Sequence, residues 1–211
     1  MSDQCCENQR FEGESRAYRR ALIAVVLINA AMFVVEASAG FLARSEALKA
    51  DALDFAGDTA TYAISLAVIG SALRVRATAA LVKGLLLAAM AVFVLSSTGL
   101  RVFAGDVPEA PVMSGVAVLA LVANTASVLI LLRWRNGDAN VRSVWLCSRN
   151  DSIGNVAVML AGGAVWLTGT PWPDLVVAAA MAGLFLRSSW AIVAQARAEL
   201  RSVTLCSSGS T

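Results

Sequence analysis

Six apolar runs fill almost the whole chain, and each is long enough to cross a lipid bilayer. A helical span needs about 20 mostly apolar residues, and only helices or closed barrels satisfy all backbone polar groups inside the hydrocarbon. We therefore expect an all-α integral membrane bundle of six transmembrane helices. The expected spans cover residues 21–43, 47–73, 77–103, 112–134, 144–167 and 175–193.

The composition leaves little room for anything beyond these spans. Only 15% of the residues are charged, whereas a soluble domain is about 25% charged. The first residues lack the apolar core and small-residue cleavage site of a signal peptide, so we expect the first helix to remain in the mature protein. The expected organisation is a polar N-terminal tail at 1–19, a six-helix transmembrane domain at 20–196 and a short polar C-terminal tail at 197–211.

The distribution of basic residues predicts the orientation in the membrane. Basic residues gather before the first expected span, in the even-numbered loops and after the last span, and they are fewer in the odd-numbered loops. The first group is Arg10, Arg16, Arg19, Arg20, Arg74, Arg76, Lys83, Arg133, Arg135, Arg142, Arg197 and Arg201, and the second is chiefly Arg44, Lys49 and Arg101. By the positive-inside rule both termini are cytoplasmic. We expect a multi-pass protein of the cell membrane, the inner membrane in a bacterium.

Several function classes are excluded by what the chain lacks. A net charge of +2 with dispersed basic residues does not form a nucleic-acid patch. There is no GxxxxGK[ST] loop, which argues against an ATP-driven pump. The spacing of Cys5, Cys6, Cys147 and Cys206 gives neither a disulfide framework nor a CxxC motif. Because the chain has no histidine, a metal site must use carboxylates and thiolates.

Two expected spans carry pairs of metal-ligand side chains. Asp54 and Asp58 are four residues apart in the second span, as are Cys147 and Asp151 in the fifth. This spacing stacks both side chains of a pair on one helix face. If the two pairs face each other, three carboxylates and one thiolate surround a point, which is the ligand number that tetrahedral zinc or cadmium requires. The sequence predicts a metal site formed by these four residues.

The negative charges of such a site favour binding of either a metal ion or protons. Buried carboxylates repel one another strongly unless a cation lies between them. This mutual exclusion is a physical basis for exchanging a metal ion against protons. The alternative is that a single Asp caps a helix or pairs with Arg149 and that a Cys fills space in the core. Two pairs at the same spacing on separate spans favour the metal site, because burying charge costs several kcal/mol, on the order of 3.

Five further residues are candidates for accessory roles. Asp51 could act as a relay carboxylate, or else cap the helix or face solvent. Glu36 in the first span could pass protons, but a structural hydrogen bond to a neighbouring helix is the favoured interpretation. Cys5, Cys6 and Cys206 in the expected tails could deliver a soft ion to the pore or have no role, since thiolate fraction depends on local charge.

Residues 33–40 and 45–58 resemble the first two helices of the cation diffusion facilitators, in which the second helix carries His or Asp, three residues, then Asp. Residues 140–155 resemble their fifth helix, with Cys147 where His is common. Trp172-Pro173-Asp174 resembles the start of their sixth helix, so the resemblance covers nearly all of 19–199. Many members carry a cytoplasmic metal-binding domain after that helix; we expect this chain to be a short member without it.

The resemblance implies a secondary active transporter rather than an enzyme. It would export a divalent metal from the cytoplasm in exchange for protons, by alternating access, often as a homodimer. No cofactor is required, because the metal ion is the substrate. A thiolate at Cys147 favours zinc, cadmium, lead or mercury over magnesium or manganese, and we expect zinc or cadmium. The alternatives are a membrane-bound metal sensor or binding protein without transport, and a scaffold with structural acids.

Overall fold

The computed structural model describes residues 16–67, 73–134 and 139–208, and it describes the side chains of these ranges except at 65, 73, 76, 134, 139–150 and 202–208. All regular structure in these ranges is helical, which confirms the expected all-α fold. The elements are α1 (Arg16–Leu42), α2 (Glu46–Ala67), α3 (Leu73–Ala104), α4 (Ala110–Leu131), the short 3-10 helix η2 (Leu132–Trp134), α5 (Ala139–Thr168) and α6 (Trp172–Ser208).

Four of the described helices, α1, α3, α4 and α6, are long and apolar enough to cross a membrane by length and composition. The two long helices outside this set, α2 and α5, are those that carry Asp54, Asp58 and Asp151. Large apolar side chains such as Phe103 and Trp190 are 90% and 79% exposed, as expected where lipid rather than water surrounds the protein. The chain is a multi-pass membrane protein.

The helix boundaries differ most from the expected spans at two places. Leu73, expected at the end of the second span, is the first residue of α3, and α2 ends at Ala67. The last helix continues to Ser208, well beyond the expected end at Val193. Residues 194–201 are mostly strong helix formers, Ala, Gln, Arg, Glu and Leu, so the helix continues although its surface becomes polar. The expected tail at 197–211 therefore begins inside α6.

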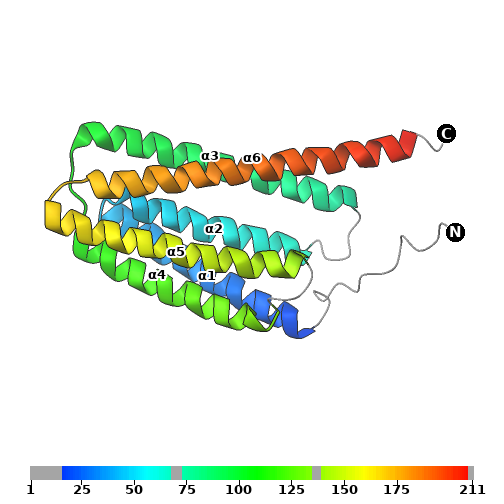
Figure 1. Ribbon diagram of the computed structural model, residues 1–211, viewed down its shortest axis with the longest axis horizontal. Coiled ribbons are helices and arrows are strands. Elements are labelled where there is room, and N and C mark those ends of the chain that lie inside the picture. Colours follow the sequence, from blue (N-terminus) through cyan, green and yellow to red (C-terminus); the bar gives the residue numbers. More distant parts are fainter. Residues whose placement is uncertain (1–15, 68–72, 135–138, 209–211) are drawn as a thin grey trace.

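The helices form two layers (Figure 1). Helices α1, α2, α4 and α5 form one group, and α3 packs along α6 as a separate pair that contacts the group chiefly through α2 and α5. The start of α1 and the end of α6 lie at the same end of the bundle (Figure 1). We call this the terminal end, and the opposite end, which holds the loops after α1, α3 and α5, the distal end.

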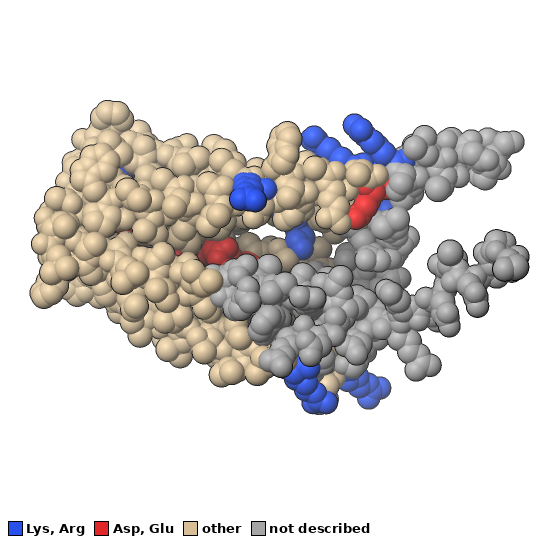
Figure 2. Space-filling view, viewed as in Figure 1, with Lys and Arg blue, Asp and Glu red and all other residues tan. Residues whose placement is uncertain are grey.

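Among the described residues, the apolar core that joins the two layers lies toward the distal end. Its largest cluster takes residues from all six long helices, including Val94 of α3, Val158 of α5 and Phe185 of α6. A second cluster, with Tyr18, Tyr62 and Leu131, lies nearer the terminal end and contains no residue of α3 or α6. Among the side chains that the structure describes, no apolar cluster bridges the layers there. The surface that these residues form is hollowed between the layers, and acidic atoms are visible inside the hollow (Figure 2).

Candidate metal site

Three acidic residues of α2 lie on one helix face. Asp51, Asp54 and Asp58 follow one another at spacings of three and four residues, which brings their side chains to one side of the helix. Asp51 is buried, whereas Asp54 and Asp58 are partly exposed. The Tyr62 hydroxyl, one turn further along, donates a 2.7 Å hydrogen bond to Oδ2 of Asp58. The row of carboxyl groups thus runs from the buried interior toward the hollow.

Asp151 brings α5 into contact with this row. Its carboxyl group lies close enough to those of both Asp54 and Asp58 to interact with them. Helix α5 runs away from the terminal end while α2 runs toward it. Cys147 therefore lies one turn from Asp151 on the terminal side, just as Asp58 lies on the terminal side of Asp54. The two antiparallel helices therefore bring at least three of the four expected ligands together.

The remaining expected ligand and the tail cysteines cannot be placed in this arrangement. The side chain of Cys147 lies outside the described residues although its backbone belongs to α5, and the same holds for Cys206 in α6. Cys5 and Cys6 also lie outside the described residues. Among the side chains that are described, no group of three or more Cys, Asp and Glu is arranged to hold a metal ion as it stands. The three carboxyl groups alone are therefore not a closed ligand shell.

A second acidic pair lies next to the row. Glu36 of α1 and Asp51 are both almost fully buried, at 0% and 1% exposure, and their carboxyl groups lie close enough to interact. Within the described part of the chain, no hydrogen-bond donor reaches either oxygen of Glu36. Its position agrees with a contact to a neighbouring helix. The alternatives that place Asp51 at a solvated surface or a helix cap are wrong, because it is buried in the second turn of α2, beyond the residues that cap the helix.

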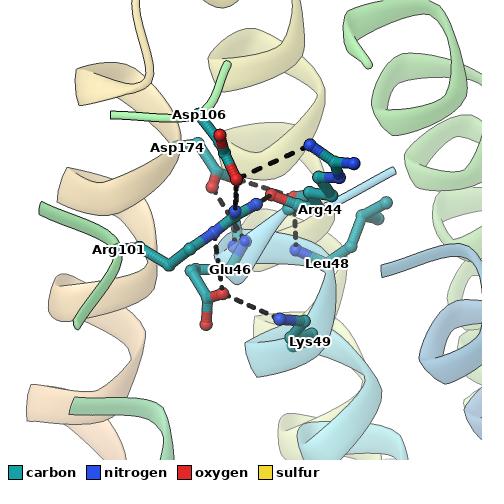
Figure 3. A network of polar contacts seen from close by, with 9 residues as sticks. Arg44, Glu46, Leu48, Lys49, Arg101, Asp106 and Asp174 are labelled. Carbon is teal, nitrogen blue, oxygen red and sulfur yellow. Dashed lines mark hydrogen bonds and ion pairs between the residues drawn. The ribbon is translucent and has the colours of Figure 1, made fainter. Parts of the chain in front are cut away.

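The distal end of α2 is closed by a different set of acidic contacts (Figure 3). Asp174 in the first turn of α6 accepts hydrogen bonds from the backbone N–H groups of Glu46 and Ala47, at 2.8 and 3.0 Å, and from the Ser45 hydroxyl at 2.6 Å. The Ser45 hydroxyl also accepts a 3.0 Å bond from Leu48 N–H, as an N-cap residue does. The first turn of α2 is therefore capped by its own serine and by an aspartate of another helix.

Ion pairs surround this cap. Oε1 of the buried Glu46 lies 2.8 Å from Lys49 Nζ and 3.4 Å from Arg101 Nε. Arg101 also pairs with Asp106 at 2.9 Å, and it donates to the backbone carbonyl of Arg44. Figure 3 shows the side chains converging from α2, the end of α3 and the following loop. The basic residues expected in the odd-numbered loops are thus neutralised by acidic neighbours.

Sequence reasoning missed three of these features. The sequence did indicate a helix start at Asp174, because Trp-Pro-Asp is typical of the first turn of a helix. It did not indicate that this aspartate pairs with Ser45, because the spacing of residues along the chain does not show such a contact. The hydrogen bond from Tyr62 to Asp58 was predictable from their spacing of four residues, which brings two side chains together on one helix face. Lys83 was counted only as a loop charge for topology, although it lies well inside α3.

Comparison with known proteins places most of the chain in one family. Residues 22–200 match the cation efflux transmembrane domain family. The chain is 27% identical over 186 residues to the metal cation efflux system protein CzcD of Cupriavidus metallidurans, covering 82% of this chain and 59% of that protein. It is also 27% identical over 194 residues to the zinc transporter ZitB of Escherichia coli, covering 86% of this chain and 62% of that protein.

The matched region thus spans about three fifths of the length of these relatives, at 59% and 62%. The family match, by contrast, covers almost all of the described helices, from α1 to α6. It includes both helices whose acidic residues meet at Asp151. The chain belongs to the cation diffusion facilitator family, whose signature is this cation efflux transmembrane domain.

Proposed function

We propose that the chain is a proton-coupled antiporter that exports a thiophilic divalent metal ion, zinc or cadmium, from the cytoplasm through a site formed by Asp54, Asp58, Cys147 and Asp151. The observation that carries this proposal is the contact of Asp151 of α5 with both acidic residues of the α2 pair. A divalent cation would offset the repulsion among these carboxyl groups, and a thiolate one turn from Asp151 would complete a four-ligand shell.

The hollow supports a route from the cytoplasm to this site. Basic residues lie toward the terminal end at Arg16, Arg19, Arg74, Arg133 and Arg201, whereas those of the distal end are held in ion pairs with Glu46 and Asp106. By the positive-inside rule the terminal end is then cytoplasmic. The hollow between the layers lies on the terminal side of the acidic atoms seen in it (Figure 2), and the cap at Asp174 closes the distal end. The described conformation is thus the one that would load metal from the cytoplasm.

Release on the other side would require the layers to separate at the distal end. Protons entering from outside would then neutralise the carboxyl groups and displace the metal ion, because metal ligands must be deprotonated to bind. In this scheme the proton gradient drives export, and the carrier returns with protons in place of metal. A site of this type near the membrane midplane, exposed alternately by rigid-body motion, is common among secondary transporters.

The relatives support the choice of ions. One is named for metal cation efflux and another for zinc transport. A soft thiolate ligand extends the expected range toward cadmium, and further toward lead and mercury. The other partners that the proposal requires are protons and the lipid bilayer, and a homodimer remains an expectation from the family resemblance.

Flux measurements in vesicles test the proposal. The purified chain is reconstituted into vesicles that are acidic inside and contain a cadmium-sensitive dye and a pH indicator. We expect external Cd²⁺ to enter while protons leave, and we expect Asp54→Asn and Asp151→Asn to abolish both fluxes. Glu199→Gln, which changes a surface acid of α6, should retain them. Saturable binding without flux would instead support a sensor, and neither binding nor flux would leave only structural acids.

A further inference from the structure

Lys83 is a lysine deep inside the apolar helix α3. The helix begins at Leu73, so ten residues separate its start from Lys83, which is about 15 Å along the axis at 1.5 Å per residue. The neighbouring positions 79–82 and 84–87 are all Ala, Leu, Val or Gly. A cation within a span is costly unless it faces an anion or a water-filled cavity. Lys83 is partly buried and is among the described residues that have an interaction partner.

The backbone of α3 is fixed against α6 at this level. A Cβ atom on Gly84 would lie 2.6 Å from Val193 Cγ2 and 3.3 Å from Val193 N, so only glycine permits this approach. The Ser189 hydroxyl donates a 2.7 Å hydrogen bond to the Gly84 carbonyl. Because Gly84 faces α6 and successive helical residues differ by about 100° in direction, Lys83 points away from this contact rather than into it.

The contact between α2 and α3 gives the direction. Gly57 approaches Leu87 of α3, since a Cβ atom on Gly57 would lie 4.0 Å from Leu87 Cδ1. Leu87 is one turn beyond Lys83 on the same face of α3. The two helices are antiparallel, so Lys83 lies one turn nearer the terminal end than this contact, and Asp58 is also on the terminal side of Gly57.

The charges of Lys83 and of the acidic row also support this position of Lys83. Lys83 interacts electrostatically with Asp58 across the space between the two layers. Figure 2 shows basic atoms inside the hollow, across from acidic atoms. Lys83 therefore belongs to α3 in one layer, whereas the acidic row belongs to α2 in the other.

We propose that Lys83 is a tethered counter-ion of the metal site, which offsets the charge of the acidic row when no metal is bound and weakens metal binding by repulsion. This inference rests on the proposed function, since it takes Asp58 as a metal ligand. The lysine side chain is long and flexible enough for its ammonium group to move aside, so metal binding displaces that group from the acidic row. An exporter must release its ion, and a tethered positive charge that stays near the site limits affinity and speeds release.

The competing interpretation is that Lys83 only extends its apolar stem along the helix to reach water, as lysines in spans often do. Equilibrium binding of Cd²⁺ to the full-length purified chain separates the two. Lys83→Met should bind Cd²⁺ at least about tenfold more tightly than the parent, because a nearby unit charge no longer repels the ion. Lys83→Arg, which keeps the charge, should stay close to the parent, as should Arg187→Met, which removes an exposed cation of α6.

Unchanged or weaker Cd²⁺ binding by Lys83→Met, with the parent binding normally, would overturn the inference. If the parent itself binds no Cd²⁺, the proposed function fails instead. A double-mutant cycle without metal then tests whether Lys83 and Asp58 interact with each other. Lys83→Met should lower the unfolding temperature of the parent but not that of Asp58→Asn, whereas additive losses would overturn the pairing. Lys83→Gln serves in both measurements if the methionine variant does not fold.

Discussion

Acidic residues at the distal end of α2 and those along its middle have opposite kinds of neighbours. At the distal end, Asp174 receives three hydrogen bonds and Glu46 has two basic neighbours, so the protein supplies the donors and cations itself. Along the middle of the helix, Asp51, Asp54 and Asp58 meet Glu36 and Asp151, which are acidic too. The first arrangement holds the fold, and the second favours a cation from outside.

The difference also explains the shape of the molecule. The two layers are joined where the charges are satisfied and where the largest apolar cluster takes residues from every long helix. They part where the acidic row is located (Figure 2). Polar networks in which every group has its hydrogen-bond partner are rigid. A membrane protein that admits an ion from one side therefore benefits when these rigid contacts are separate from the charged groups that meet the ion.

The largest expected effect is at the acidic row. Asp151→Asn should weaken Cd²⁺ binding at least about 100-fold, because even second-shell changes cost about 10–100-fold. The same change should leave the metal-free protein as stable as the parent or more stable, since it removes a like charge from the cluster. Isothermal titration and thermal unfolding in detergent measure the two quantities. A variant that loses stability while keeping its affinity would reverse the assignment of roles.

Asp174→Ala should have the opposite outcome. It removes the acceptor of two backbone N–H groups and of the Ser45 hydroxyl, and we expect a loss of about 2 kcal/mol in unfolding free energy. The affinity of the folded protein for Cd²⁺ should change little. Ser45→Ala provides a milder version of the same lesion. If Asp174→Ala leaves the unfolding temperature unchanged, the cap does not hold the distal end together.

A smaller effect is expected at Cys147. Cys147→Ser should weaken Cd²⁺ binding by about tenfold relative to Zn²⁺, because a hydroxyl is a harder ligand than a thiolate. Cys147→His should restore zinc binding but not the cadmium preference. Cys206→Ser provides the matched control, and competition between the two ions gives the ratio. An unchanged ratio in Cys147→Ser would exclude the thiol as a ligand.

The smallest effect is expected at Asp106. It pairs with Arg101 at 2.9 Å and with Arg44 at 3.6 Å, but its side chain is 45% exposed. Exposed ion pairs contribute about 0–1 kcal/mol, so Asp106→Asn should shift stability by no more than a few tenths of a kcal/mol. A loss as large as that of Asp174→Ala would mean that the ion pairs, rather than the cap, close the distal end.

The sequence was sufficient to predict the helices and the pairs that carry the acids. Hydropathy identified six helices because the bilayer imposes both their length and their polarity, and the i, i+4 spacing placed Asp54 with Asp58. The end of α6 was misjudged because Ala, Gln, Arg and Glu continue a helix that hydropathy ends. Contacts between distant residues, such as Asp174 with Ser45 or Lys83 with Asp58, depend on how helices pack, and no local pattern encodes them.

Diffraction from crystals of the full-length chain grown with Cd²⁺ and measured for its anomalous signal would locate the ion itself. We predict one strong peak between α2 and α5, bounded by the carboxyl groups of Asp54, Asp58 and Asp151 and by the sulfur of Cys147. A peak at the distal Glu46 and Asp106, or none between α2 and α5 at Cd²⁺ concentrations that saturate transport, would contradict the assignment of this acidic row as the ion-binding site.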